Sequence, residues 1–596
     1  MSALTAWARK MREIFIGGST SQFIIYGNVF DLVPVNRDND RTEFVSLNTF
    51  LEEALFSPFE VVIFYDRGKG IRVRKGMEEF QKYLSIFDSF NNTTYATSPG
   101  QMPRDPRRAL ELIGRFIQVG LQRATISHGS EVSREKSDDV KRIPNPIKVA
   151  VVIDYAQYVV PRGDLMQLIG DTSEVIIKIL DWANDPAILG ANIVTCLVAE
   201  NLNDLNSLIV QSPYNAKIKV DMPKEADILE FLQHFTMNNP DFSQYCSLDM
   251  PNLAQKLIGL TRVNIRSMLS LAVRNKSEIS VLFLGKNKKE IIEKECNDLL
   301  EFIESPYTLD MVAGHREARN WLREDAWLIR NGKTRSVPMG YLLTGGIGTG
   351  KTYLATCWAG ELGIPFVKFK NFRDKWQGAT EGNLEKIFIV LDALGQVVVF
   401  IDEADQSTGK RDGGAGDSGV SGRVYSMLAQ KMSDTRNRGR IVWILATSRP
   451  DLLEVDLKRQ GRLDVHIPLF SPQTEEDRNE LFRVVAKKLG TDLAADRIPR
   501  LPPGLEMGGN EMEALLVRAH RAFDLQKEGE TVKSLDEILS GLLAEFRPSA
   551  YTGALEYMDL VAVKECTDSR FLPEKYKNLT PDDLERRLEQ AKRYVR

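Results

Sequence analysis

Short runs of consecutive apolar residues alternate along the chain with stretches whose apolar residues are spaced like one face of a helix. The runs are rich in β-branched residues and occupy 23–29, 60–66, 148–155, 192–200, 339–345, 366–370, 396–405 and 440–448. Strands that are buried on both faces of a parallel sheet have this unbroken apolar character. The alternation therefore predicts an α/β fold with parallel sheets, and the pattern occurs once in each half of the chain.

A helical pattern follows the last apolar run of each half. We therefore predict two modules, each with a parallel-sheet α/β core and a small helical lid. The predicted segments are a first core over 1–222, its lid over 223–284, a linker over 285–306, a second core over 307–471, its lid over 472–547, and a C-terminal tail over 548–596 that ends in a helix. Polar tracts at 90–106 and 127–146 have the composition of loops inserted into the first core.

Composition narrows the function classes only slightly. The chain has 596 residues, of which 43% are hydrophobic and 27% charged, and a formal net charge of −4, which is typical of a soluble globular protein. This charge argues against a protein that grips nucleic acid through bulk basicity. The five cysteines form no CxxC and no histidine belongs to an HExxH, which argues against a disulfide framework and a zinc protease. The polar start and the absence of an apolar run of about 18 residues predict a cytoplasmic protein.

The strongest chemical motif is a glycine-rich segment between a predicted strand and a predicted helix. It matches GxxxxGK[ST] and consists of Gly345, Gly346, Ile347, Gly348, Thr349, Gly350, Lys351 and Thr352. Glycines let successive backbone N–H groups curl around phosphate oxygens. Lys351 is expected to reach the β- and γ-phosphates of ATP, and Thr352 to place its hydroxyl on Mg²⁺. Tyr353, which follows directly, belongs to the predicted nucleotide-binding set.

A second motif follows about fifty residues later, where the apolar run 397–401 leads directly into Asp402 and Glu403. A buried strand that ends in two carboxylates needs a cation at its tip. We expect Asp402 to hold Mg²⁺ through water and Glu403 to orient and polarise the attacking water.

With these motifs in this order, the segment from about 309 to about 525 resembles the AAA+ ATPases, specifically the subgroup of the valosin-containing protein, katanin and the membrane-bound AAA proteases. The resemblance implies that Ser448 is the polar sensor residue after the fourth strand, where the family usually has an asparagine. It also implies that Arg459 and Arg462 are arginine fingers that enter the nucleotide site of a neighbouring subunit. The expected assembly is therefore a homo-oligomeric ring, a hexamer in this family.

The same resemblance implies further contacts with nucleotide and substrate. The adenine is expected against the backbone of Val312, Ala313 and Gly314, and the lid is expected to close through Gly509 and Asn510. The central-pore loop of the family corresponds to Lys375, Trp376, Gln377 and Gly378, where the glutamine replaces the usual apolar residue. A ring of tryptophans can grip a polypeptide without reading its sequence. Alternatively, Trp376 covers the core beneath a loop, and the glycine-rich stretch 409–419 is either a second pore loop or a surface loop.

The first half has the strands without this chemistry. The segment 26–31 contains no GK[ST], and the nearest lookalikes, Gly68-Lys69-Gly70 and Gly285-Lys286-Asn287, lack the hydroxyl and the upstream glycine spacing. The strand that corresponds to 397–401 ends in Asp154 and Tyr155, so the catalytic glutamate is missing. Because 259–276 resembles a lid, we interpret this half as a degenerate AAA+ module used for ring assembly or partner docking. An unrelated α/β domain is the alternative.

Together these features predict an ATP-hydrolysing AAA+ ring that remodels, disassembles or unfolds a protein partner of unknown identity. The alternative is a nucleotide-switched scaffold or assembly factor with slow hydrolysis, which the short side chain of Ser448 keeps open. The chain also resembles uncharacterised bacterial and plastid AAA+ proteins and the ATPases of contractile injection systems. A nucleic-acid motor is disfavoured by the acidic charge and the aromatic pore loop.

Overall fold

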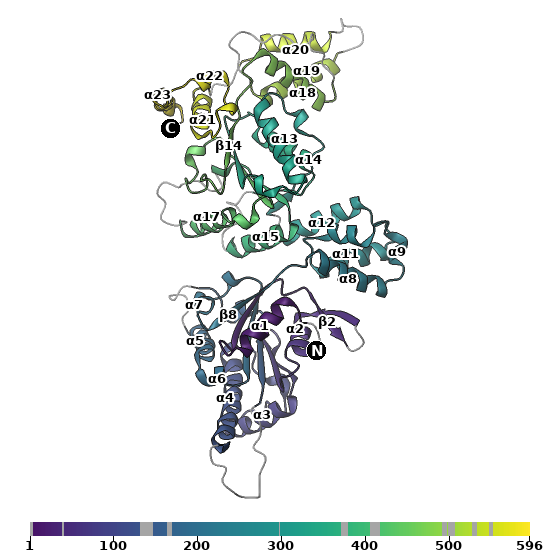
Figure 1. The fold of residues 1–596 in the computed structure, drawn as a ribbon, viewed down its shortest axis with the longest axis vertical. Coiled ribbons are helices and arrows are strands. Elements are labelled where there is room, and N and C mark those ends of the chain that lie inside the picture. Colours follow the sequence, from purple (N-terminus) through teal and green to yellow (C-terminus); the bar gives the residue numbers. More distant parts are fainter. Residues whose placement is uncertain are drawn as a thin grey trace. The chain divides into compact units, whose positions relative to one another are not determined.

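Two six-stranded sheets form the framework of the molecule, one in each of two compact units. The computed structural model describes residues 4–37, 41–131, 147–163, 170–296, 299–370, 380–405, 418–491, 498, 507–526, 533–547 and 552–595. The first unit comprises Met1–Ile291 with Glu381–Ala393, and the second comprises Ile292–Thr380 with Leu394–Arg596 (Figure 1). The boundary after Ile291 lies inside the predicted linker 285–306.

The first sheet has the strand order β5-β4-β6-β7-β1-β8. Its strands are β1 (Gln22–Gly27), β4 (Val61–Asp66), β5 (Gly70–Lys75), β6 (Val149–Ile153), β7 (Ile193–Ala199) and β8 (Asn215–Val220). All neighbouring strands are parallel except β5, which pairs antiparallel with β4 at the edge. The parallel strands predicted at 23–29, 60–66, 148–155 and 192–200 are therefore present, and β5 and β8 join them.

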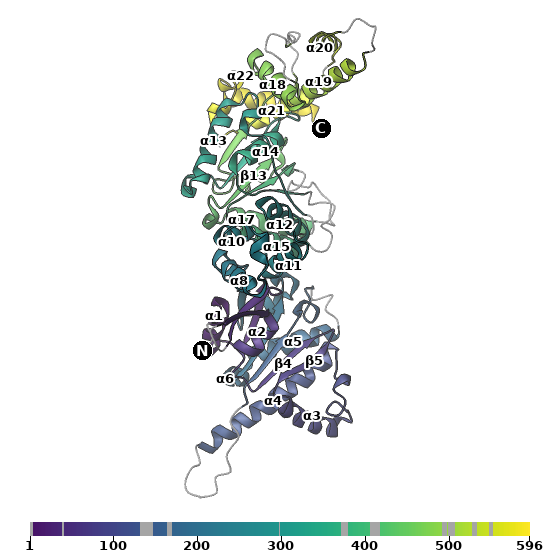
Figure 2. The ribbon, with the colours of Figure 1, turned by 90° about the vertical axis from the view of Figure 1, so that its right-hand side faces the viewer.

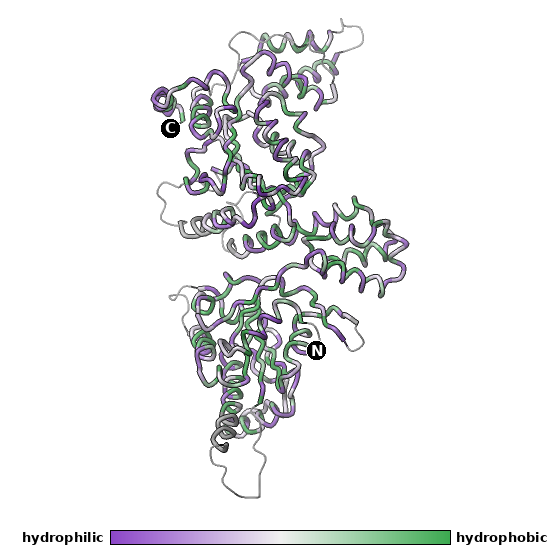
Figure 3. Tube along the Cα trace, viewed as in Figure 1, coloured by the Kyte–Doolittle hydropathy of each residue, from purple (hydrophilic) through white to green (hydrophobic). Residues whose placement is uncertain are grey.

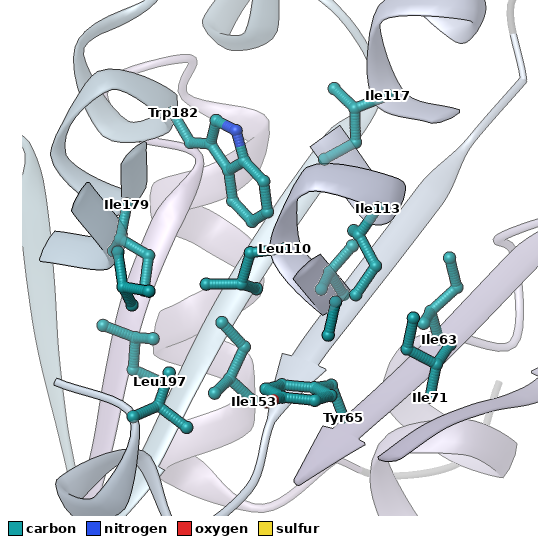
Figure 4. Close-up of a cluster of buried hydrophobic side chains, with 14 of the residues drawn as sticks. Ile63, Tyr65, Ile71, Leu110, Ile113, Ile117, Ile153, Ile179, Trp182 and Leu197 are labelled. Atoms are coloured by element: carbon teal, nitrogen blue, oxygen red, sulfur yellow. The ribbon is translucent and has the colours of Figure 1, made fainter. Parts of the chain in front are cut away.

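Both faces of the first sheet are buried, which explains the unbroken apolar runs. Alternate residues of β6 contribute to two different clusters, with Val151 and Ile153 in one and Ala150 and Val152 in the other. The first cluster also receives Leu110, Ile113, Ile179 and Trp182 from helices, as Figure 4 shows. The helices of this core are α1 (Ala6–Ile16), α2 (Leu47–Phe50), α3 (Met77–Asn91), α4 (Pro106–Glu131), α5 (Asp171–Asn184), α6 (Pro186–Gly190) and α7 (Ser207–Gln211).

A separate hairpin of β2 (Leu32–Arg37) and β3 (Arg41–Ser46) follows β1. Its mixed polar and apolar residues give no apolar run, so the sequence pattern does not reveal it. The helical lid that follows the core consists of α8 (Glu225–Asn238), α9 (Phe242–Tyr245), α10 (Met250–Leu257), α11 (Arg262–Arg274) and α12 (Val281–Glu295). Helix α12 therefore extends into the predicted linker.

The second sheet has the order β14-β10-β13-β12-β11-β9. Its strands are β9 (Leu300–Phe302), β10 (Gly340–Thr344), β11 (Phe366–Phe369), β12 (Val397–Ile401), β13 (Ile441–Ala446) and β14 (Val465–Pro468). Again the neighbours are parallel except for the edge strand, because β9 pairs antiparallel with β11. The predicted linker thus supplies the edge strand of this sheet. In Figure 3 the tube is largely green, and so hydrophobic, along the central strands.

Helices surround the second sheet and form its lid (Figures 1 and 2). The helices of the second unit are α13 (Arg316–Arg330), α14 (Lys351–Leu362), α17 (Ser418–Met432), the lid helices α18 (Glu475–Lys488), α19 (Gly509–Asp524) and α20 (Leu535–Ala544), and the C-terminal α21 (Thr552–Glu565), α22 (Glu574–Lys577) and α23 (Pro581–Ala591). Helix α15 (Thr380–Leu394) follows β11 in the sequence, but its residues Glu381–Ala393 group with the first unit. The chain is thus a mixed α/β protein with two parallel-strand sheets. No helix in the described ranges combines the length and the apolar character that a membrane crossing requires.

Candidate nucleotide site

The glycine-rich loop connects the buried strand β10 to helix α14, the context that its sequence predicts. Gly345 has a φ of +132°, and a Cβ on this residue would lie 2.0 Å from the carbonyl oxygen of Leu469. Only glycine fits so close to the neighbouring backbone. Gly350, with a φ of +88°, precedes α14, whose first residue is Lys351. The loop therefore places the N-terminus of α14, with its outward N–H groups, where an anion can bind.

Lys351 ties this loop to the end of β13. Its Nζ donates hydrogen bonds to the carbonyl oxygens of Gly345 at 2.9 Å and Gly346 at 2.8 Å, and to the hydroxyl of Ser448 at 3.0 Å. Burial lowers the pKa of Lys351 to about 8, and the negative charge of Asp402 opposes this shift. The structure thus brings the predicted lysine and the predicted sensor serine into direct contact, although 97 residues separate them.

Thr352 and Asp402 face each other beside this lysine. The Thr352 hydroxyl lies 3.1 Å from Oδ2 and 3.3 Å from Oδ1 of Asp402, the residue that follows β12. A hydroxyl and a carboxylate are oxygen donors that suit Mg²⁺, so these two residues fit the ion that the motif implies. The same carboxylate also accepts from the Lys368 ammonium at 2.9 Å and from the backbone N–H of Glu403 at 3.1 Å.

Lys368 is a site residue that sequence reasoning missed. It lies on β11, where the apolar run 366–370 has a lysine in its middle. A charged residue inside a run that is otherwise buried is a signal of pairing, but the sequence does not say with which residue. Only the pairing of β11 with β12 in the structure identifies the partner of Lys368 as Asp402.

Glu403 has a left-handed backbone with a φ of +46° and is the second residue after the buried strand β12. A residue with a Cβ pays about 1 kcal/mol for this conformation, which is uncommon outside sites that need it. The residue is exposed. Two residues later, Asp405 accepts a hydrogen bond of 2.6 Å from the Thr447 hydroxyl, so the end of β13 holds the turn that follows β12.

A cavity of about 840 Å³ opens beside the loop. It is lined by predicted nucleotide-binding residues, namely Val312, Ala313, Gly314, Gly348, Thr349, Gly350, Tyr353, Gly509 and Asn510. This volume is in the range of small-molecule sites. Helix α18 fixes one wall, because Glu480 accepts from the backbone N–H of Gly314 at 2.9 Å and pairs with Arg319 at 3.2 Å. Burial lowers the pKa of His315 in this wall to about 4, so its imidazole is neutral at neutral pH.

The C-terminal segment, predicted as a tail over 548–596, supplies a further wall of the cavity. The same cavity is lined by Arg570, Phe571, Leu572, Pro573, Glu574, Lys575 and Lys577. Nearby, Oδ1 of Asp559 on α21 is 3.3 Å from the point where a Cβ on Gly346 would lie. Sequence reasoning had no means of finding these residues, because the resemblance ends at about 525.

The two predicted arginine fingers differ in their surroundings. The Arg459 side chain is 71% exposed and lies 3.1 Å from the carboxylate of Asp456. The Arg462 side chain is only 17% exposed, pairs with the same carboxylate and donates to the carbonyl oxygen of Asp456 at 2.6 Å. Arg459 is therefore the one that presents its guanidinium to solvent. The predicted pore-loop residues 375–378 lie outside the described residues, as does 409–417 of the second glycine-rich stretch.

In the first unit the corresponding strand ends hold different groups. Asp154, directly after β6, accepts from the Asn48 amide at 2.8 Å and pairs with Arg72 at 3.3 Å. Arg72 also pairs with Asp66 at 2.5 Å. Tyr155 follows with a φ of +51°, and its ring centroid lies 5.5 Å from that of Phe30. These positions hold ion pairs and aromatic rings, whereas the corresponding positions of the second unit hold Glu403 and the glycine-rich loop with Lys351.

Comparison with known families agrees with this division. Residues 341–470 match the family described as ATPase family associated with various cellular activities (AAA). Residues 1–221 match "AAA+ chaperone, N-terminal Rossmann-like domain", and residues 229–297 match "AAA+ chaperone, second helical domain". These matches confirm the resemblance to AAA+ proteins in both halves of the chain.

Several curated proteins are similar over part of their length. ATP-dependent zinc metalloprotease FtsH 2 of Salinibacter ruber (strain M8) is 32% identical over 273 residues, which are 43% of this chain and 38% of that protein. FtsH of Syntrophobacter fumaroxidans is 31% identical over 277 residues, 44% of this chain and 41% of that protein. Mitochondrial FTSH 3 of Oryza sativa subsp. japonica is 29% identical over 280 residues, 44% of this chain and 34% of that protein. The chain therefore spans about two fifths or less of the length of these relatives.

Proposed function

From the ATP-hydrolysing AAA domain over residues 341–470, which follows two domains of AAA+ chaperones in the sequence, we propose that the chain is an ATP-driven machine that remodels a protein partner. We further propose that it works as a ring of identical subunits, a hexamer. The contact of Lys351 with both the glycine-rich loop and Ser448, beside the Thr352–Asp402 pair, supports the ATP-driven part of this proposal. The matches to two AAA+ chaperone domains support the action on a protein partner.

ATP binding would exchange hydrogen bonds at Lys351. Its ammonium now satisfies two loop carbonyls and the Ser448 hydroxyl, and these are weaker acceptors than the phosphate oxygens that the loop would receive. The adenine would lie in the cavity against 312–314, and Gly509 and Asn510 of the lid helix α19 would border the phosphates. Binding thus draws the core and the lid of the second unit onto one ligand.

Hydrolysis would use the residues at the end of β12. Thr352 and Asp402 would hold Mg²⁺, which when bound neutralises charge that develops on the phosphates. Glu403 would orient the attacking water and accept its proton, since its side chain is exposed two residues after the buried strand. Ser448 would donate to that water or to the γ-phosphate when Lys351 turns towards the nucleotide.

The ring assignment depends on Arg459. An exposed guanidinium on a segment braced by the pairing of Lys458 with Glu565 is suited to reach a neighbouring subunit. An arginine supplied in this way is worth about 10³- to 10⁵-fold in rate. Arg462, which is held by Asp456, would position the segment. The grip on the partner would come from Trp376 in the pore loop, and the first module would serve in ring assembly or docking.

A trapping experiment tests the function directly. The Glu403→Gln variant retains the residues that bind ATP but lacks the carboxylate that activates water, so we expect it to hold ATP and remain bound to its protein partner. Affinity capture followed by mass spectrometry would identify that partner, with Lys351→Ala as the matched control that binds no ATP and captures nothing. If Glu403→Gln retains ATP and captures only other copies of itself, the nucleotide-switched scaffold is the better interpretation.

A mixing experiment tests the ring. Arg459→Ala and Glu403→Gln should each lose nearly all turnover. A mixture of the two should recover part of it, because some interfaces then combine an intact Glu403 with an intact Arg459 from the neighbour. Steady-state phosphate release measures this recovery. An Arg459→Ala chain with undiminished turnover, or a mixture without recovery, would contradict an arginine supplied in trans.

A further inference from the structure

Lys368 occupies an unexpected place for a cation. It lies on β11, paired in register with Phe400 of β12, two residues before Asp402. Its Nζ is 2.9 Å from Oδ2 of Asp402 and 5.6 Å from the centroid of the Phe400 ring. The side chains of Lys368 and Asp402 are 30% and 23% exposed, so the pair is mostly shielded from water. The ammonium is therefore a defined neighbour of the carboxylate rather than a surface contact.

The Asp402 carboxylate is also the group that the site offers to Mg²⁺. Its described partners are the Thr352 hydroxyl, the Glu403 backbone N–H and the Lys368 ammonium. A divalent cation that approaches Thr352 and Asp402 meets the positive charge of Lys368 on the same carboxylate. Two cations that share one acceptor in a partly buried place repel each other appreciably. Filling the metal site must weaken or displace the Lys368 contact.

The first unit contains a more closed version of this arrangement. Asp154, which also follows the third parallel strand of its sheet, pairs with Arg72, and Arg72 pairs in addition with Asp66. The side chains of these two aspartates are only 8% and 7% exposed. Arg72 is held by two buried carboxylates, so another cation does not readily displace it. Lys368 is held by one more exposed carboxylate, so a metal ion can displace it.

We propose that Lys368 is a resident counter-ion of Asp402 that competes with Mg²⁺, and that it thereby sets the Mg²⁺ concentration at which the nucleotide site fills. This inference rests on the proposed ATPase function and concerns the same site. In the absence of the metal, Lys368 neutralises a carboxylate that would repel the phosphates. In its presence, Lys368 raises the amount of Mg²⁺ that is needed.

Equilibrium binding of a fluorescent ATP analogue to the full chain tests this, with free Mg²⁺ varied in a chelator buffer. For Lys368→Met we expect the Mg²⁺ concentration at half-maximal binding to fall by about tenfold. In excess EDTA we expect the same variant to bind the analogue several-fold more weakly than the wild type. Lys368→Gln should reproduce both shifts. These opposite changes cannot come from general damage to the site, which would weaken binding under both conditions.

Two controls separate this effect from charge in general. Lys368→Arg keeps the cation and should keep the wild-type Mg²⁺ requirement. Lys370→Met removes an equal charge two residues away, where Nζ lies 4.0 Å from Glu301, and should leave the midpoint unchanged. Equal midpoints for wild type and Lys368→Met, or an equal shift in Lys370→Met, would overturn the inference while leaving the ATPase function intact. A wild-type chain that binds no nucleotide at any Mg²⁺ concentration would instead overturn the proposed function itself.

Discussion

The two sheets of this chain share one plan and differ in a few side chains. In both, five parallel strands are arranged so that the first strand of the core lies between the fourth and the fifth, and an antiparallel strand closes the edge beyond the second. β1 thus corresponds to β10, β6 to β12 and β8 to β14. The sequence of the first unit nevertheless lacks counterparts of Lys351 and Glu403, so the strand order of the sheet alone does not make an ATP site.

Backbone details agree more closely than side chains. A Cβ on Gly27 would lie 2.6 Å from the carbonyl oxygen of Val220, as one on Gly345 would lie 2.0 Å from that of Leu469. The residue after the aspartate is left-handed in both units, with a φ of +51° at Tyr155 and +46° at Glu403. The strand ends thus keep their geometry while the reactive groups differ. Packing therefore maintains the backbone at the strand ends in both units, whereas the chemistry depends on the glycine-rich loop and the side chain of Glu403.

The largest expected difference between the units concerns nucleotide binding. Lys351→Ala should lower the affinity for an ATP analogue by at least about 100-fold, because the phosphates lose a charge-assisted partner. Lys69→Ala, in the lookalike of the first unit, should leave the affinity unchanged. Isothermal titration calorimetry should also give one nucleotide per wild-type chain. Two nucleotides per chain, or residual tight binding in Lys351→Ala, would show that the first unit is not degenerate.

The second-largest expected effect concerns Gly27 and Gly345, the two glycines that lie against a neighbouring carbonyl oxygen. Gly345→Ala and Gly27→Ala should each destabilise their unit by about 3 kcal/mol or more, because the new methyl group meets a carbonyl oxygen and the φ is unfavourable. Only Gly345→Ala should also impair nucleotide binding. Gly363→Ala, with a φ of +67° and no atom near its Cβ, should cost only about 1 kcal/mol and so isolates the backbone term. Calorimetric melting measures all three, and an equal cost for Gly363→Ala would argue against the close approach as the cause.

The strand-end cations should differ in their importance for stability. Arg72→Met leaves Asp66 and Asp154 buried without their cation and should cost about 3 kcal/mol. Lys368→Met should cost about 1 kcal/mol or less, since Asp402 is more open and keeps the Thr352 hydroxyl. Chemical denaturation of the metal-free chain compares the two. A larger loss for Lys368→Met would reverse the proposed contrast between a permanent and an exchangeable pair.

The smallest expected effect concerns a buried carboxylate on helix α13. Asp325 is buried and accepts a hydrogen bond of 2.6 Å from the Tyr341 hydroxyl, and burial raises the pKa of Asp325 to about 6. The folded state therefore binds this proton more tightly than the unfolded state does. As a result, the free energy of unfolding of the wild type rises as the pH falls from above 6 towards the ordinary pKa of an aspartate.

Asp325→Asn keeps an acceptor for Tyr341 and removes the titration. Its stability relative to the wild type should therefore be higher at pH 8 than at pH 5, by about 1 kcal/mol. Urea unfolding at the two pH values measures the difference, and Asp310→Asn, a change at an exposed side chain, serves as the control. A relative stability that does not change with pH would show that Asp325 titrates normally.

Part of the site could be predicted because its signals are local. The glycines before Lys351 and the carboxylates after β12 stand next to the strands that place them, and parallel strands bring their carboxyl ends to one edge of a sheet. The short strands β9 and β14 and the hairpin of β2 and β3 were not predicted, since three to six residues of mixed polarity give no clear period.

By itself, the sequence determined the alternation of strands and helices, the phosphate-binding loop and the loss of that loop in the first half, because each depends on neighbours along the chain. Only the tertiary structure decided which residues complete the site. It paired Lys368 with Asp402 across 34 residues, placed 570–575 in the wall of the cavity, and distinguished the exposed Arg459 from the more buried Arg462. The physical reason is that such contacts depend on which strands become neighbours and which charges are shielded from water, and neither can be read from the local pattern of residues along the chain.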